Sequence, residues 1–267
     1  MNGQPSAALR TATLRLLVIP FAVYAAWVLE IFLLAGSVSV FVRFNPTGIV
    51  LYTVIACIIT GLIAPLVCLR TAFLSGAINM FQIGFRSLRR TFFAGFLTSV
   101  GIYGAILFFN PFGTDRLAFA NAFILLLPTA ISSVMMCWVL MGTHVQAFVR
   151  GGGALISLSV GISVTTVLYG VAMVSSVPSS VDQRFFLSLV SLGIIAAFFF
   201  FAVRDIYATS LFVGAGAVFC MADRIDPLYL QNAALPVWFS LVLAVCTLSV
   251  IHWYLSRNYV TVTIPVL

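Results

Sequence analysis

One carboxylic acid lies well inside an apolar stretch of this 267-residue chain. Glu30 follows a long run of apolar residues, and its own helical face offers no strong polar partner. A charge at the centre of a bilayer costs about 2.5–3.5 kcal/mol on insertion scales, so such groups usually face the interior of a helix bundle. We therefore expect Glu30 to be a proton or cation site. The alternatives are an acid hydrogen-bonded to a neighbouring helix and an acid displaced toward the membrane interface.

Small and hydroxyl-bearing residues recur at helical spacing in three other apolar stretches. Such stripes can line a narrow polar cavity, and a proline in mid-helix frees carbonyl groups that can bind a solute. The same residue types also allow close packing of helices in lipid, so packing is the alternative interpretation. Beside Glu30, the candidate path consists of Thr53, Pro65, Asn121, Pro128, Thr129, Ser132, Ser159 and Ser163.

Two histidines and an aspartate form a third candidate group. His144, His252 and Asp205 fall at the same ends of their predicted helices, where they could bind a metal or relay a proton. Isolated histidines at helix ends more often cap carbonyl groups, and no CxxC or HExxH pattern accompanies these three. We predict no metal and no cofactor, and an enzyme using this group is the third of our functional hypotheses.

The composition indicates which elements must position these residues. Hydrophobic residues make up 63% of the chain and charged residues 7%, whereas soluble proteins carry about 25% charged residues. The net charge of +7 is not gathered into a basic run interleaved with polar and aromatic residues, so a nucleic-acid partner is not expected. The lipid bilayer is the expected surrounding.

Eight stretches are long enough to cross a hydrocarbon core as helices, which takes about 20 residues. They predict an all-α, polytopic membrane bundle with one transmembrane domain over 14–255, between a cytoplasmic segment 1–13 and a cytoplasmic tail 256–267. Only Arg204 and Asp205 separate the sixth stretch from the seventh. The predicted spans are Leu14–Gly36, Gly48–Leu69, Thr91–Phe109, Leu117–Val145, Ala154–Ser175, Phe185–Val203, Ile206–Ala222 and Ala234–Leu255.

The basic residues predict the orientation of these spans. The chain has thirteen arginines and no lysine, and basic residues are retained in cytoplasmic loops. Four arginines lie in one set of alternate gaps, at 43, 116, 184 and 224, where four aspartates cancel their charge. The other set of gaps carries nine arginines against Asp205, so we expect both termini on the cytoplasmic side of the plasma membrane. The nine are Arg10, Arg15, Arg70, Arg86, Arg89, Arg90, Arg150, Arg204 and Arg257.

The segment between the second and third spans has helical periodicity of its own. Polar residues recur at 75, 79, 82, 86 and 89, and apolar residues recur at 74, 78, 81, 85 and 88. Two such stripes predict an amphipathic helix over about 72–90 on the cytoplasmic interface. This helix is either an anchor on anionic lipid or a surface that docks a protein partner through Gln82, Arg86, Arg89 and Arg90.

These patterns favour a transporter- or permease-like protein that moves a small or amphipathic solute. The alternative is a non-catalytic subunit of a larger membrane complex, including the membrane subunit of an ATP-driven exporter. A homo-oligomer is compatible with either. The chain itself cannot bind ATP through a Walker motif or retinal through a Schiff base, because both need a lysine.

Overall fold

The computed structural model describes residues 7–74, 78, 80–109, 115–177, 182–231 and 234–258. The described residues form helices joined by turns, without a β-strand. Eight of the helices are long and apolar enough to cross a membrane, and each overlaps one of the predicted spans. These eight are Leu17–Gly36, Pro46–Phe73, Leu88–Phe109, Arg116–Phe148, Ala154–Ser176, Gln183–Val203, Ile206–Arg224 and Leu235–Asn258.

Four of these spans change helix type along their length, and short helices lie between others. The elements are α1 (Ala7–Ile31), η1 (Phe32–Gly36), α2 (Pro46–Tyr52), η2 (Thr53–Ile63), α3 (Ala64–Leu74), α4 (Met80–Ile83), α5 (Leu88–Phe109), α6 (Arg116–Ser133), η3 (Val134–Gly142), α7 (Thr143–Phe148), η4 (Arg150–Gly152), α8 (Ala154–Ser176), α9 (Gln183–Val203), α10 (Ile206–Met221), η6 (Ala222–Arg224), α11 (Pro227–Gln231) and α12 (Leu235–Asn258).

Aspartate and asparagine side chains begin several of these helices. Asp205 Oδ1 accepts a hydrogen bond from the backbone N–H of Ala208 at 2.9 Å, and Asp182 Oδ1 accepts one from Phe185 at 2.7 Å. Asp115 and Asn45 cap α6 and α2 in the same way. Each cap satisfies donor groups that the first turn of a helix leaves without a partner. Most of the few acids of this chain therefore define helix starts.

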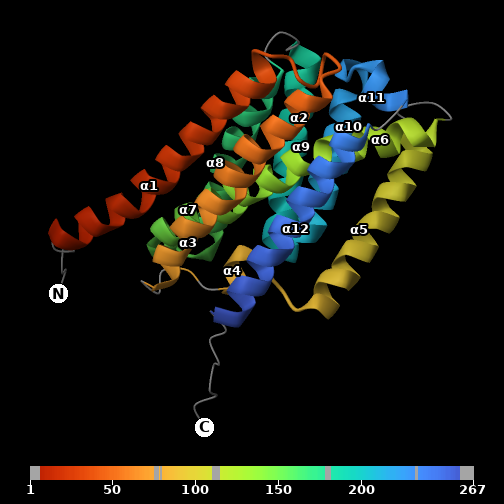
Figure 1. Ribbon diagram of the computed structural model, residues 1–267. Coiled ribbons are helices and arrows are strands. Elements are labelled where there is room, and N and C mark those ends of the chain that lie inside the picture. Colours follow the sequence, from red (N-terminus) through yellow and green to blue (C-terminus); the bar gives the residue numbers. More distant parts are fainter. Residues whose placement is uncertain are drawn as a thin grey trace.

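The span formed by α6, η3 and α7 lies at the centre of the bundle. Of its most apolar window, 89% is buried, and α6 packs against α10, α11, α12 and η2. By contrast, none of the described residues of α5 is buried, and its main neighbour is α10. Figure 1 shows α5 at the edge of the bundle, inclined away from the other helices.

The two central spans contain long π-helical stretches, η2 and η3. In a π-helix each N–H bonds the carbonyl five residues earlier, as Ala64 does with Ile59. Pro65 follows η2 and Pro128 precedes η3, and a proline cannot donate to the regular α-helical ladder. These long π-helical stretches are rare, and π-helical turns are frequent at functional sites.

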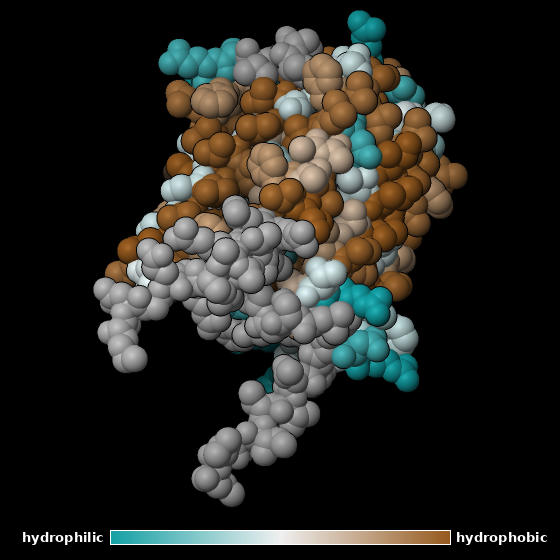
Figure 2. Space-filling model, turned by 90° about the vertical axis from the view of Figure 1, so that its left-hand side faces the viewer, coloured by the Kyte–Doolittle hydropathy of each residue, from teal (hydrophilic) through white to brown (hydrophobic). Residues whose placement is uncertain are grey.

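The outer surface is apolar along the flank of the bundle. Figure 2 shows mostly hydrophobic residues between two ends where hydrophilic residues gather. α1 begins and α12 ends at the same end of the bundle (Figure 1), where the α9–α10 turn also lies. We call this the arginine-rich end, since Arg70, Arg86, Arg89, Arg90, Arg204 and Arg257 belong to the segments that meet there.

The predicted interfacial helix over 72–90 is wrong in its described part. α3 ends at Leu74, α4 has four residues, and Gly84 has a φ of 87° that ends the helix before α5 begins at Leu88. Residues 75–77 and 79 lie outside the described residues. Phe85 is buried against the bundle, whereas Leu88 is exposed, so the apolar stripe does not face one surface. The apolar residues that gave this periodicity are divided between a buried environment, at Phe85, and an exposed one, at Leu88.

The junction between the sixth and seventh spans is a tight turn. Arg204 adopts the left-handed conformation with a φ of 51°, and Asp205 caps α10. A non-glycine residue in this region costs about 1–2 kcal/mol, so surrounding contacts must hold it. The turn lets α9 and α10 form two separate helices of 21 and 16 residues, the second extended by η6.

Candidate functional site

Hydrogen bonds fasten the segment before α5 to the α9–α10 turn at the arginine-rich end. Arg204 donates from Nη1 to the carbonyl oxygen of Gln82 and from Nη2 to Oε1 of Gln146, both at 2.8 Å. Arg86 Nε donates to the carbonyl oxygen of Arg204 at 3.0 Å. An added Cβ at Gly84 would approach the Arg204 carbonyl group to 3.2 Å, which explains the glycine. Gln82 and Arg86 therefore belong to a joint within the protein.

Burial and mutual repulsion act on the two arginines of this joint. Burial and, to a smaller extent, the positive charge of Arg86 together lower the pKa of Arg204 to about 10. Burial also lowers the pKa of Arg86, as does the charge of Arg90, while Asp205 opposes this shift. Among the described residues of these segments, the cationic charge thus exceeds the one carboxylate, that of Asp205.

Asp205 connects this joint to the start of α5. Its side chain is fully buried, and Oδ2 accepts a hydrogen bond from the Thr91 hydroxyl at 2.7 Å. Oδ1 caps α10, as described above. The two carboxylate oxygens therefore bind α5 and α10 together at one point. This role is structural.

The two histidines do not join Asp205 in a metal site. His252 lies 3.1 Å from the Tyr207 hydroxyl through Nδ1 and packs against Phe85, whereas His144 Nδ1 bonds the Leu140 carbonyl of its own helix at 2.7 Å. Among the described residues, no group of three His, Cys, Asp or Glu side chains could hold a metal ion. Both histidines were predicted at the same ends of their helices, which suggested that they lie together. In the structure each of them has separate contacts.

Part of the predicted polar path comes together at the centre of the bundle. Thr129 Oγ1 donates to the Tyr52 hydroxyl at 3.2 Å, and the Cys57 thiol lies within hydrogen-bonding reach of Tyr52, Thr129 and Ser132. Thr53 is buried beside them on η2. An added Cβ at Gly61 would lie 2.5 Å from the Cβ of Ser132. This is close packing of small residues between helices, and it leaves no channel here.

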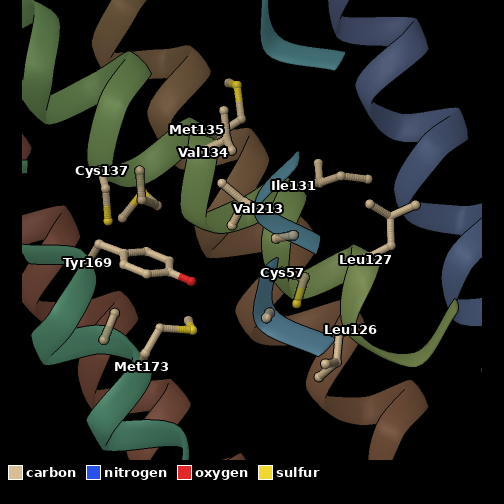
Figure 3. Packing of buried hydrophobic residues seen from close by; sticks show 14 of the residues in the cluster. Cys57, Leu126, Leu127, Ile131, Val134, Met135, Cys137, Tyr169, Met173 and Val213 are labelled. Atoms are coloured by element: carbon tan, nitrogen blue, oxygen red, sulfur yellow. The ribbon is translucent and has the colours of Figure 1, made fainter. Parts of the chain in front are cut away.

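Several buried polar atoms near this centre have no hydrogen-bond partner in the described part of the chain. They include Nε1 of Trp27 and of Trp138, and the hydroxyl of Tyr169. Figure 3 shows the Tyr169 hydroxyl pointing into the cluster near Met173 and Val213. These three residues line a cavity of about 10 Å³, which is roughly the space of one water molecule. The centre can accommodate a water but not a solute.

Other predicted path residues lie away from this centre. Ser159 and Ser163 are exposed on the outer face of α8, whereas Thr165, Thr166 and Ser176 of that helix are buried. Asn121 donates to the Leu230 carbonyl at 2.8 Å at the opposite end of the bundle. Ser159, Ser163 and Asn121 therefore do not share one path. The stripe on α8 was assigned to the wrong face.

Glu30 and the two prolines complete the predicted set. Glu30 lies one turn beyond Trp27 on α1 and is half-buried. Its Oε2 is enclosed without a hydrogen-bond partner among the described residues. Pro65 and Pro128 are both buried, next to the π-helical stretches.

A large groove lies on the flank of the bundle, between α5, α9 and α10. Its volume is about 840 Å³, within the range of roughly 300–1,000 Å³ typical of ligand pockets. Its only polar side chain is Thr98, whose hydroxyl bonds the Ala94 carbonyl of its own helix. The groove therefore fits an apolar chain. Its lining includes Ala94, Gly101, Ala105, Phe199, Gly216 and Phe219.

Sequence reasoning missed this groove because its walls come from separate segments. On α5 the lining residues Ala94, Thr98, Gly101 and Ala105 recur at helical spacing, which is a detectable stripe. Nothing in that stripe identifies α9 and α10 as the opposing walls. The site residues of this chain also have no precedent to guide their assignment: no protein-family model, no curated protein and no solved structure matches this chain.

Proposed function

We propose that the chain is a multi-pass, transporter- or permease-like protein of the plasma membrane that moves an amphipathic solute. The observation that supports this proposal best is the apolar groove of about 840 Å³ on its flank. A groove formed by membrane-length helices lies beside the acyl chains of the bilayer. The apolar part of an amphipath can enter it sideways, without leaving lipid.

The proposed orientation places the arginine-rich end in the cytoplasm. Basic residues are hard to translocate, and both α1 and α12 have their outer termini at this end (Figure 1). In this orientation the Thr91–Asp205 hydrogen bond lies at the cytoplasmic end of the groove. The termini are cytoplasmic.

A lateral carrier agrees better with the packing than a central channel. The polar residues at the centre are close-packed around a cavity of about 10 Å³, too small for a solute. α5, in contrast, is the helix least enclosed by the bundle. We propose that the solute moves along α5, and that displacement of α5 relative to α10 opens its path.

A groove-blocking substitution tests the proposal. Gly101 lines the groove, and a Cβ added there meets nothing within 4 Å, so Gly101→Trp introduces a large side chain into the groove at an open position. Gly104 on the same helix is equally open but lies outside the groove lining, so Gly104→Trp is the matched control. The probe is a phospholipid with a fluorescent headgroup, in vesicles whose outer leaflet is bleached by dithionite.

We expect the wild-type protein to speed the exposure of inner-leaflet probe by more than about tenfold over empty vesicles, a change in barrier of about 1.4 kcal/mol or more. Gly101→Trp should abolish this gain, and Gly104→Trp should retain it. A wild-type protein that leaves the rate at the empty-vesicle value contradicts the proposal. Equal loss in both variants contradicts the assignment of the path to the groove.

The exposed face of α5 favours a second candidate, a non-catalytic subunit of a larger membrane complex or a homo-oligomer. Phe92 and Phe93 are 77% and 63% exposed, and a partner helix would cover them. In the version in which residues 72–90 dock an ATPase, Gln82 and Arg86 bind within the chain, and Arg89 and Arg90 are the exposed residues of the predicted surface. Crosslinking from cysteines placed at 92 and 93 in native membranes would identify a partner, and crosslinks to lipid alone would contradict this candidate.

A further inference from the structure

Cationic charge exceeds anionic charge at the cytoplasmic end of the groove. Arg86, Arg89, Arg90 and Arg204 lie in the segments that meet there, and Asp205 is the acid that these described segments contribute. Among the described residues, the structure records no ion pair for Arg89 or Arg90, and both are exposed. A partner with negative charge would complement this end.

Arg90 is aligned with the groove and Arg89 is not. The groove residues Ala94 and Leu97 lie four and seven positions after Arg90, so all three share one face of α5. Arg90 is then one helical turn, about 5.4 Å, beyond the end of the groove lining. Arg89 is rotated by about 100° from that face, as each residue turns the helix by this angle.

The apolar part of the site has the length of a lipid chain. From Ala94 to Phe109 the lining of α5 spans sixteen residues, or about 22 Å of helix. One leaflet of a hydrocarbon core is about 15 Å thick, half of the roughly 30 Å bilayer interior. The groove can therefore hold one acyl chain over its whole depth in the leaflet.

The groups around Arg90 disfavour a neutral partner. The charge of Arg90 lowers the pKa of Arg86, in addition to the effect of burial. Burial and the charge of Arg86 lower the pKa of Arg204 to about 10. The single carboxylate of Asp205 is already bound by Thr91 and by the α10 backbone. An anion at Arg90 would relieve the repulsion among these cations.

We infer that the groove binds an anionic phospholipid of the cytoplasmic leaflet, with one acyl chain along α5 and the phosphate on Arg90. The inference rests on the proposed function, because it names the chemical class of the solute in the same groove. The evidence for the chain is the apolar groove, and the evidence for the headgroup is the unpaired Arg90 in line with it.

Photolabelling in vesicles tests this inference without requiring transport. The purified protein is reconstituted in phosphatidylcholine vesicles that contain a trace of phosphatidylglycerol or of phosphatidylcholine with a diazirine in the acyl chain. After illumination, labelled peptides of α5, α9 and α10 are quantified by mass spectrometry. We expect about fivefold more groove labelling by the phosphatidylglycerol probe, the effect of one basic residue near an anionic lipid.

The variants form matched pairs. Arg90→Gln should reduce the ratio of the two probes to about one, while Arg89→Gln, with the same change in net charge, should leave it near fivefold. Arg90→Lys keeps the charge and should keep most of the preference. Gly101→Trp should remove groove labelling by both probes, and Gly104→Trp should not. Circular dichroism and thermal unfolding confirm that each variant is folded.

The two proposals fail separately. Equal labelling by both probes in the wild type, or equal losses in Arg89→Gln and Arg90→Gln, would overturn the anionic site at Arg90. Selective labelling that disappears in Arg90→Gln supports that site even in a protein that moves no lipid. That last result would contradict the transport proposal alone.

Discussion

Two membrane-length helices of this chain are alike in composition and opposite in environment. α5 and the α6–η3–α7 span are both strongly apolar, yet the most apolar window of the first has 0% of its residues buried and that of the second 89%. Hydropathy therefore predicts that a helix can cross a membrane, and it does not predict whether lipid or protein surrounds it. In lipid the two environments are similarly apolar, so packing alone makes the difference.

Their glycines illustrate the same contrast. On α5, Gly101 and Gly104 have nothing within 4 Å of an added Cβ. At the centre, a Cβ added at Gly61 on η2 would lie 2.5 Å from Ser132 of α6, and one added at Gly142 on η3 would lie 3.0 Å from Thr165. The first pair leaves space for a ligand, and the second pair allows helices to approach. The same residue type thus serves opposite purposes in the two regions.

The largest difference between the regions should appear when an aromatic side chain is removed. Trp138 on η3 is fully buried, so Trp138→Ala should lower the free energy of unfolding by about 3–5 kcal/mol. Phe96 on α5 is 57% exposed, and Phe96→Ala should cost less than about 1 kcal/mol. Thermal unfolding in the same detergent measures both. Similar losses would show that α5 is packed as tightly as the centre.

A smaller contrast should follow from adding one methyl group. Gly61→Ala places a Cβ against Ser132 and the Ala56 carbonyl, and overpacking of this kind costs about 1–3 kcal/mol. Gly104→Ala meets no atom and should stabilise α5 slightly, by up to about 1 kcal/mol, because alanine is the better helix former. Denaturant titration distinguishes the two signs. A destabilised Gly104→Ala would mean that α5 has a close neighbour on this face.

The smallest effect concerns the attachment of α5. Thr91→Val removes the hydrogen bond to the buried Asp205 carboxylate and should cost about 1.5 kcal/mol, with faster amide hydrogen exchange in the first turns of α5. Thr98→Val is the control, since its hydroxyl bonds only the carbonyl of its own helix. Unchanged exchange in Thr91→Val would show that contacts with α10 alone hold α5.

The extent of the helices could be predicted from the sequence, whereas their faces and junctions could not. Long apolar runs identified each membrane-length helix, because chain length and hydropathy suffice for that. Ser159 and Ser163 were assigned to an inner face by their spacing, yet spacing alone does not say which face of a helix is inward. The predicted 72–90 helix is interrupted at Gly84, and hydrophobic periodicity does not reveal that this glycine has a positive φ.

The candidate site was harder to predict than the fold. Thr129 and Ser132 do contact the second span at the centre, through Tyr52 and Gly61, since small-residue stripes favour close approach. The Arg204 joint needed the knowledge that Gln82 and Gln146, far apart in sequence, lie beside one turn. The groove likewise depends on which helices are neighbours. Such long-range pairings leave no local signal in a single sequence.

The π-helical stretches of the two central spans are wound differently from the α-helices on either side of them. Because η2 uses more residues in each turn than an α-helix does, its conversion to α-helix would make the same eleven residues longer and more tightly wound. α3 would then rotate and shift relative to α2, and with it the exposed Arg70 near the end of α3. η3 has the same property in the neighbouring span. The two closely packed central spans thus each contain a π-helical segment, and its conversion to α-helix would turn a shift at one end of the span into rotation at the other end.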